Sequence, residues 1–240
     1  MKRFWDQATA ERIDTGFEIR LDGKPMRLPS GGPLVVGSER LAQAIAEEWQ
    51  AAGGEKGGEM SFADTPLTRL AGTAQERIAP DPHPIVDAIA RYGESDLLCY
   101  RAETPPELVR RQDAQWQPWL EWVETVHGAP LRVTTGVGFV RQHHDTVSAL
   151  RRVVATCSAD TLVALGIAVP ATGSLVLGLA LAAGKLDAST AHALALLDET
   201  FQAEQWGADS EAAKRQASLA ADIALAERYI RLTSDIRDVA

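Results

Sequence analysis

Residues 17–28 read Phe-Glu-Ile-Arg-Leu-Asp-Gly-Lys-Pro-Met-Arg-Leu and carry the clearest structural signal of the chain. From residue 17 to residue 21 apolar and charged residues alternate, which is the period of a strand with one buried face. Asp22-Gly23 favours the positive φ angles of a two-residue hairpin turn, and the alternation resumes at Met26. The stretch therefore predicts an antiparallel hairpin near the N-terminus.

Helical patterns follow this hairpin along the rest of the chain. Apolar residues at a spacing of four predict a helix over residues 39–52, and Trp49 lies on its apolar stripe. Similar stripes and stop signals predict further helices over about 105–126, 188–206 and 210–233.

A proline-rich break at residues 80–84 separates the mixed part of the chain from the helical part. We therefore predict an α+β protein of two domains. Residues 1–80 form a small N-terminal α+β domain with antiparallel hairpin strands, and residues 81–240 form a larger all-α C-terminal domain. A chain of 240 residues is long enough to bury such cores without a metal or a disulfide framework.

The charge balance excludes two classes of partner. The chain has 24 basic and 33 acidic residues, a formal net charge of −9. A binder of nucleic-acid phosphates needs a basic face, and so does a protein that attaches to an anionic membrane. The uncharged residues 161–184 are interrupted by Pro170 and Gly173 and are predicted to form two short buried helices rather than a membrane span.

Motifs for small-molecule chemistry are missing from the sequence. It contains no GxxxxGK[ST] loop, no GxGxxG, no GxSxG and no HExxH. Cys99 and Cys157 show no paired spacing and are predicted to be free thiols. We expect no nucleotide, no metal and no other cofactor.

Carboxylates dominate one stretch near the C-terminus. Between Lys185 and Lys214 there are six acids and no base, so this stretch supplies most of the net charge. The six are Asp187, Asp198, Glu199, Glu204, Asp209 and Glu211. A hydrolase could use two such carboxylates if they faced each other across a cleft, and a solvated helix face would look the same in sequence.

The spacing within this stretch favours a binding surface. Glu199, Gln202 and Trp206 fall at positions i, i+3 and i+7, which lie on one face of a helix. Trp is enriched among the residues that dominate the affinity of protein interfaces. Trp5, Trp49 and Trp206 are therefore candidate anchors, and core packing is the alternative for each. For Trp49, which shares its apolar stripe with Leu41 and Ile45, core packing is the favoured interpretation.

Several collinear motifs resemble one known family over nearly the whole chain. They are Lys2-Arg3-Phe4-Trp5, Leu21-Asp22-Gly23-Lys24-Pro25, Glu47-Glu48-Trp49, Pro66-Leu67-Thr68-Arg69-Leu70-Ala71, Ser95-Asp96-Leu97-Leu98-Cys99-Tyr100-Arg101-Ala102, Gln112 with Trp116 and Pro118, Gly173-Ser174-Leu175, and Leu197-Asp198-Glu199-Thr200-Phe201-Gln202 with Trp206-Gly207. The family is that of the assembly chaperones for the catalytic head of F-type ATP synthase, in particular the member that binds the alpha subunit.

The resemblance implies a two-part fold and a role without catalysis. Such a chaperone would bind a free alpha subunit, cover the surface meant for the beta subunit, and leave when beta arrives. It implies that an acid of the C-terminal block is important, and the predicted partner-binding residues are Glu199, Gln202, Glu204, Trp206, Asp209 and Glu211. The predicted structural motif residues are Phe4, Trp5, Asp22, Gly23, Trp49, Asp96 and Trp116. A hydrolase and a binding module for another protein are the alternatives.

The first residues contain neither a secretory signal nor an Arg- and Ser-rich targeting pattern. Together with the free cysteines this predicts a bacterial cytoplasmic protein, and a mitochondrial one only if a targeting segment has been removed.

Overall fold

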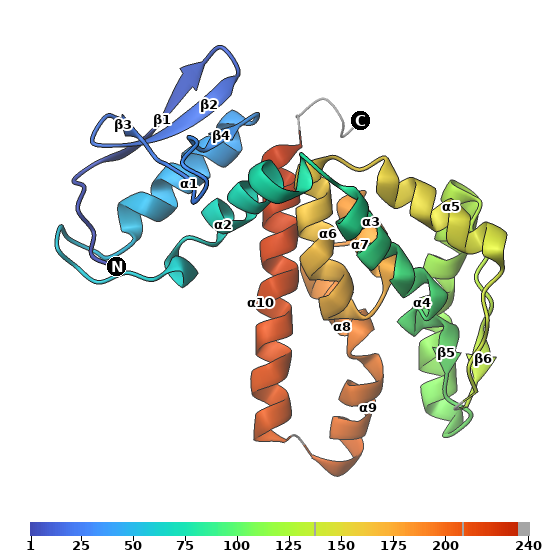
Figure 1. Cartoon of the computed structure of the whole chain (residues 1–240). Coiled ribbons are helices and arrows are strands. Elements are labelled where there is room, and N and C mark those ends of the chain that lie inside the picture. The colour runs from blue at the N-terminus through green and yellow to red at the C-terminus, as the bar shows by residue number, and fades with distance from the viewer. Residues whose placement is uncertain (137, 208, 235–240) are drawn as a thin grey trace. The chain divides into compact units, whose positions relative to one another are not determined.

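The computed structural model describes residues 1–136, 138–207 and 209–234. It contains two compact units, drawn together in Figure 1. The N-terminal unit consists of Met1–Pro82 and of the described chain end from Arg228, and the helical unit spans His83–Glu227. The last helix therefore begins in one unit and ends in the other, which no sequence signal indicated.

A small antiparallel sheet forms one side of the N-terminal unit. Its strands are β1 (Ala8–Ile13), β2 (Gly16–Leu21), β3 (Lys24–Pro25) and β4 (Val35–Val36). The central strand β2 pairs with all three others. The predicted hairpin is present between β2 and β3, where Asp22 and Gly23 have φ angles of 49° and 76°.

Helix α1 (Glu39–Ala51) covers the sheet in this unit (Figure 1). Its apolar stripe is buried, including Leu41, Ile45 and Trp49. The Ser38 hydroxyl accepts the Leu41 N–H as an N-cap and donates to the Leu232 carbonyl at 2.5 Å. The chain end that returns to this unit is therefore tied to the start of α1.

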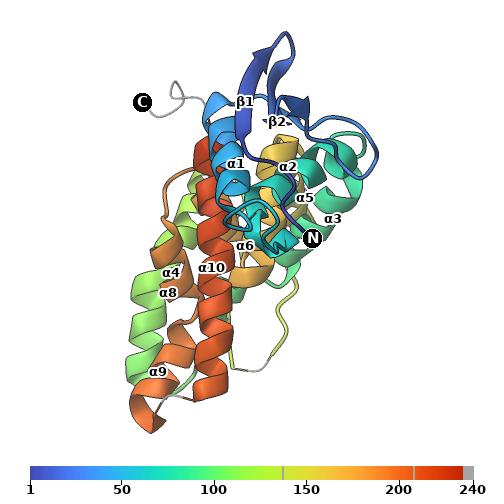
Figure 2. The same ribbon diagram turned by 90° about the vertical axis from the view of Figure 1, so that its left-hand side faces the viewer.

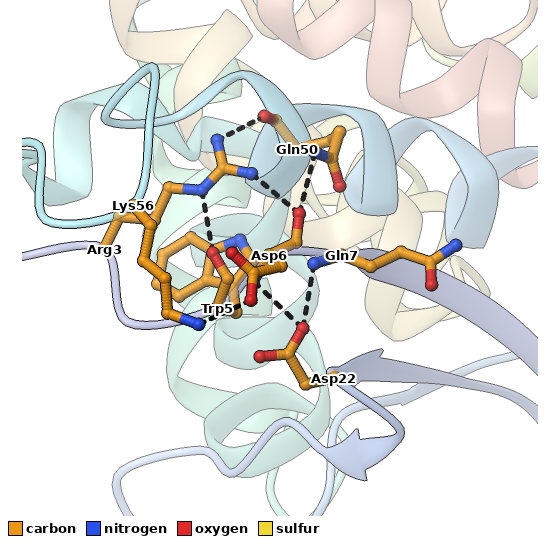
Figure 3. Close-up of polar contacts among 7 residues, drawn as sticks. All are labelled: Arg3, Trp5, Asp6, Gln7, Asp22, Gln50 and Lys56. Carbon is orange, nitrogen blue, oxygen red and sulfur yellow. Dashed lines mark hydrogen bonds and ion pairs between the residues drawn. The ribbon is translucent and has the colours of Figure 1, made fainter.

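The Lys2-Arg3-Phe4-Trp5 motif builds a buried corner at the end of α1 (Figure 3). The Trp5 indole is fully buried, donates to the Trp49 carbonyl at 3.1 Å, and lies with its ring centre 4.9 Å from that of Trp49. The buried Arg3 guanidinium donates to backbone carbonyls, among them those of Trp5, Asp6, Gln50 and Gly54. Arg3 thereby satisfies carbonyls that the C-terminus of α1 and the loop after it leave unpaired.

Asp22 has a second role beside the hairpin turn. Its carboxylate accepts the backbone N–H groups of Asp6 and Gln7, both at 2.9 Å (Figure 3). These hydrogen bonds lower the pKa of Asp22. The turn residue therefore also fixes the path of the chain between the Trp5 corner and β1.

Three further segments complete the N-terminal unit: η1 (Phe62–Asp64), α2 (Pro66–Thr73) and the π-helical turn η2 (Ala74–Ile78). Pro66 occupies the first position of α2, but Thr65 makes no side-chain cap. The half-buried Glu48 carboxylate of α1 instead accepts the N–H groups of Leu67 and Thr68 at 2.8 and 3.2 Å. A distant acid thus caps this helix because its negative charge favours the helix N-terminus.

Eight α-helices are described in the helical unit. They are α3 (His83–Ala90), α4 (Pro106–His127), α5 (His144–Ala155), α6 (Ala159–Thr172), α7 (Leu175–Ala182), α8 (Ala188–Ala195), α9 (Leu197–Trp206) and α10 (Ser210–Thr233), of which the last ends in the N-terminal unit. Short 3-10 segments η3 (Arg91–Glu94) and η4 (Leu97–Cys99) follow α3.

One prediction for this unit needs correction. The single helix predicted over 188–206 is divided at Leu196, where ψ is 17°, into α8 and α9. The predicted helical character of the unit is confirmed, and its helices are accompanied by one short parallel pair of strands, β5 (Tyr100–Arg101) and β6 (Thr134–Thr135). Each of these strands is two residues long, so the pair leaves the helical architecture intact.

A buried carboxylate holds the centre of the helical unit. Asp96 accepts from the Ser174 hydroxyl at 2.7 Å and from the N–H groups of Val176 and Leu98 at 3.0 and 3.1 Å. The loss of hydration on burial raises the pKa of Asp96 to about 6, against the opposing effect of these donors. Asp96 therefore links the segment after η3 to the N-terminus of the buried helix α7.

Trp116 and the neighbouring helices complete the core of this unit. The Trp116 indole is buried, donates to the Leu194 carbonyl of α8 at 2.9 Å, and lies with its ring centre 5.3 Å from the Arg101 guanidinium.

Within the described residues, no helix combines the length and the apolar character needed to cross a bilayer.

Candidate functional site

Helix α9, which carries most of the predicted partner-binding residues, is held on α4. Leu197 and Phe201 are the buried residues of α9, and the Arg111 guanidinium of α4 lies 5.1 Å from the centre of the Phe201 ring. Figures 1 and 2 both show α9 beside the first turns of α10, to which it is joined by a short connection. The opposite face of α9 is left to form a surface with α10.

A groove of about 440 Å³ runs between α9 and the start of α10. Glu199, Gln202 and Trp206 line it from α9, so the structure places these three residues together as their spacing predicted. Ala203, Ala212 and Ala213 supply apolar wall, and Asp209, Arg215 and Gln216 supply polar groups. The indole of Trp206 is 79% exposed, the largest value among the exposed hydrophobic residues of the described chain.

The acidic stretch is less free than the sequence suggested. The Glu199 carboxylate accepts from Arg215 at 2.6 Å and from the Gln216 amide at 3.1 Å, both on α10. Glu204 accepts from Arg111 of α4 at 2.7 Å. Folding therefore brings bases from other helices onto a stretch that has none of its own.

Asp209 and Glu211 lie at the start of α10. The Asp209 carboxylate accepts the Glu211 N–H at 3.2 Å, and the exposed Glu211 carboxylate lies 3.4 Å from the Lys214 ammonium. Ion pairs as exposed as this last one contribute little to stability. The start of α10 therefore carries two carboxylates, one of which lies within reach of the exposed Lys214 ammonium.

Asp198 was left out of the predicted site, although it is the acid most deeply held on α9. It accepts from the buried Gln112 amide of α4 at 2.7 Å, and the Gln112 oxygen accepts the Ala102 N–H at 2.8 Å. Desolvation raises the pKa of Asp198, while the Gln112 hydrogen bond and the charge of Arg101 oppose that shift. Asp198 thus fixes α9 on α4 and does not line the groove.

The other two candidate anchors, Trp5 and Trp49, are buried and do not reach the protein surface. Trp5 and Trp49 are buried against each other in the N-terminal unit, so core packing is confirmed for Trp49 and the hypothesis that Trp5 grips a partner is wrong. Phe4, next to them, is 64% exposed and packs edge-on against the Trp5 ring. Of the three tryptophans, only Trp206 is free to touch a partner.

The pairing of Glu199 with Arg215 had a signal in the sequence. Glu199 lies eight residues before Gly207 and Arg215 lies eight residues after it. In two antiparallel helices joined by a short turn, residues equally far from the turn face each other. The pairing of Glu204 with Arg111 had no such signal, because 93 residues separate them.

The described residues contain no group of three or more His, Cys, Asp or Glu side chains that could hold a metal ion. Cys99 is buried and Cys157 half-buried, and both thiols are free. Burial raises the pKa of the Cys99 thiol to about 12, which makes it a poor nucleophile.

Comparison with known proteins identifies the class first, which is that of chaperones. The structure matches the crystal structure of Atp12 from Paracoccus denitrificans, and also that of an aspartate-to-lysine mutant of the same protein, each with 42% identity, a TM-score of 0.91, and coverage of 97% of this chain and 98% of the other. A protein of Agrobacterium tumefaciens, described as a candidate chaperone, matches with 37% identity, a TM-score of 0.89, and coverage of 97% and 86%.

The family follows from two further matches. Residues 2–124 match the model of the ATP12 chaperone protein family. The mitochondrial protein atp12 of Schizosaccharomyces pombe is 27% identical over 220 residues, which are 88% of this chain and 75% of that relative. The chain belongs to the ATP12 chaperone family, the family of ATP synthase assembly chaperones that its motifs resemble.

Proposed function

We propose that this chaperone binds the free alpha subunit of the ATP synthase catalytic head and covers the surface that alpha later presents to beta. An unassembled subunit exposes apolar surface that promotes aggregation. A protector that must leave again needs a contact of moderate affinity with a few aromatic anchors. Membership of the ATP12 chaperone family supports a client in ATP synthase assembly.

The observation that carries the proposal is the exposed Trp206 indole at the edge of the α9–α10 groove. A folded protein gains by burying an indole, so a tryptophan that is 79% exposed at the end of α9 suits contact with a partner. The groove also carries Glu199 and Asp209, and Glu211 lies next to it. We therefore propose that a basic or amide-rich surface of alpha docks here, with Trp206 as its anchor.

We further propose that the groove binds and does not catalyse. A glycosidase-type hydrolase needs two carboxylates opposed across a cleft with different protonation states. The acids that line the groove are Glu199 and Asp209, and the Glu199 carboxylate is already paired with Arg215 at 2.6 Å. The free thiols and the bacterial relatives of known structure support a cytoplasmic site of action.

Capture of partners from the native organism tests the client. The tagged wild-type chain is expected to retain the ATP synthase alpha subunit, identified by mass spectrometry, from cells in which beta is depleted. Failure to retain alpha under these conditions would remove the proposed client.

Variants test the surface in the same assay. Glu211→Lys and Glu199→Lys are expected to abolish retention without unfolding the chain, because each places a positive charge where a basic client surface would dock. Phe62→Ala is the matched control, since Phe62 is 71% exposed but lies in the N-terminal unit. Retention by both lysine variants at the wild-type level would contradict the role of the groove.

A further inference from the structure

The α9–α10 groove contains an ion pair between two of the residues that line it, Glu199 and Arg215. The groove already holds a guanidinium, because Arg215 Nη2 lies 2.6 Å from Glu199 Oε2. Gln216 donates to the same carboxylate oxygen at 3.1 Å. The Glu199 carboxylate, which lines the groove, is therefore occupied by a side chain of the chaperone itself.

This ion pair is easily exchanged. The Arg215 and Glu199 side chains are 55% and 38% exposed, so solvent screens their attraction. The Arg215 guanidinium is held by one carboxylate contact and can move into solvent on a long, flexible side chain. A guanidinium that arrives with additional contacts would therefore displace it.

The groove offers such additional contacts next to Glu199. The Trp206 indole lines the same hollow, and a guanidinium that lies over an indole face gains a cation–π attraction. Ala203, Ala212 and Ala213 provide a shallow apolar wall that fits an aliphatic side chain beside it. When Arg215 leaves, Glu199 and Asp209 are the charged side chains that line the groove.

We infer that the groove takes an arginine side chain of the client, flanked by an apolar residue, and that Arg215 is an internal placeholder that occupies Glu199 until the client arrives. The inference rests on the proposed function, because it names the chemistry that alpha would present to the same groove. Arginine fits better than lysine because its planar group can contact both the Glu199 carboxylate and the Trp206 ring.

Two substitutions that are expected to change the affinity for alpha in opposite directions test the role of Arg215 as a placeholder. Arg215→Gln vacates Glu199 and is expected to tighten the binding of purified alpha subunit about two- to fivefold, the range of an exposed ion pair. Glu199→Gln removes the acceptor for the client arginine and is expected to weaken binding about tenfold, as loss of a charged partner at an interface does. If the pair served only to hold α9 on α10, both substitutions would weaken binding.

Lys214→Gln is the matched control for Arg215→Gln. It removes the same charge from the neighbouring position, and Lys214 pairs with Glu211 and not with Glu199. Calorimetric titration of alpha into the three variants and the wild type gives the dissociation constants. Equal tightening by Lys214→Gln and Arg215→Gln, or no tightening by Arg215→Gln, would overturn the inference.

A peptide titration separates this inference from the identity of the client. Acetyl-Leu-Arg-Leu-amide is expected to change the fluorescence of Trp206 at lower concentration in Arg215→Gln than in the wild type, whereas acetyl-Leu-Gln-Leu-amide is not. Trp206→Phe is the control that lacks the responding indole and gives the background fluorescence change. A positive peptide result with no binding of alpha would refute the proposed client and retain the arginine site, and equal responses to both peptides would refute the arginine site.

Discussion

Trp5 and Trp206 belong to motifs that resemble the same family, yet they have opposite environments. Trp5 is fully buried in a corner where Arg3 and Trp49 complete its packing and hydrogen bonds (Figure 3). Trp206 lies 79% exposed at the end of α9, beside ion pairs that solvent reaches. The presence of a tryptophan in a family motif therefore does not tell whether it stabilises the fold or contacts a partner. Its burial in the structure does.

The largest effect on stability is expected at the buried corner around Trp5. Trp5→Ala removes an indole from a closed site and leaves a cavity, which costs about 3–5 kcal/mol of the free energy of unfolding. Chemical denaturation measures this loss, and Phe4→Ala, one residue away and exposed, is the control that should stay near the wild-type value. A loss below about 1 kcal/mol for Trp5→Ala would show that the corner is not a closed core.

The next effect concerns the pH dependence of the helical unit. Because the pKa of Asp96 is about 6 in the folded chain and the ordinary pKa of an aspartate carboxyl is 3.8, the folded state holds an extra proton between these pH values. The contribution of Asp96 to stability is therefore greatest below pH 3.8, falls as the pH rises through that window, and is constant above pH 6. Asp96→Asn cannot titrate and lacks this fall.

Denaturation of the wild type and Asp96→Asn at pH 4 and pH 7 measures this difference. Between pH 7 and pH 4, the free energy of unfolding of the wild type is expected to rise by about 2–3 kcal/mol relative to that of the variant, which follows from the size of the pKa shift. A stability difference that stays the same at both pH values would refute a raised pKa for Asp96.

A smaller effect is expected for the cap of α2. Glu48→Ala removes the acceptor for the N–H groups of Leu67 and Thr68 and should cost about 1 kcal/mol, as the loss of an N-cap does. Glu47→Ala serves as the control, because Glu47 is the exposed neighbour of Glu48 on α1. Thermal melts compare the two variants, and an unchanged melting temperature for Glu48→Ala would contradict the capping role.

The smallest effect on stability is expected at the groove. Trp206→Ala removes a side chain that is mostly in solvent, so the free energy of unfolding should change by less than about 0.5 kcal/mol. Its circular dichroism and denaturation midpoint should match those of the wild type. A loss of several kcal/mol would mean that Trp206 is a structural residue like Trp5 and would remove the contrast between the two regions.

Local signals in the sequence predicted much of the fold. Asp22-Gly23 indicated the hairpin because few residue pairs accept positive φ at both positions. The periodicity over residues 39–52 and the stripe and stop signals over about 105–126 indicated the extents of α1 and α4. The face shared by Glu199, Gln202 and Trp206 followed from helical spacing alone.

What local signals missed depends on contacts between distant residues. Arg111 neutralises Glu204 and Glu48 caps α2, although neither pair is close in sequence. The division between α8 and α9 at Leu196 has no glycine or proline to mark it, and the Leu194 carbonyl just before it accepts from Trp116. Such pairings arise from the packing of helices and have no local signature.

The central claim is that the α9–α10 groove binds the client through Trp206, and the affinity of Trp206→Ala for purified alpha subunit tests it most directly. Titration calorimetry with the wild type, Trp206→Ala and Phe62→Ala compares two aromatic side chains of similar exposure in different units. We predict that Trp206→Ala weakens binding at least about 30-fold, as loss of a tryptophan anchor does, while Phe62→Ala binds like the wild type. Wild-type affinity in Trp206→Ala, or an equal loss in Phe62→Ala, would contradict the account.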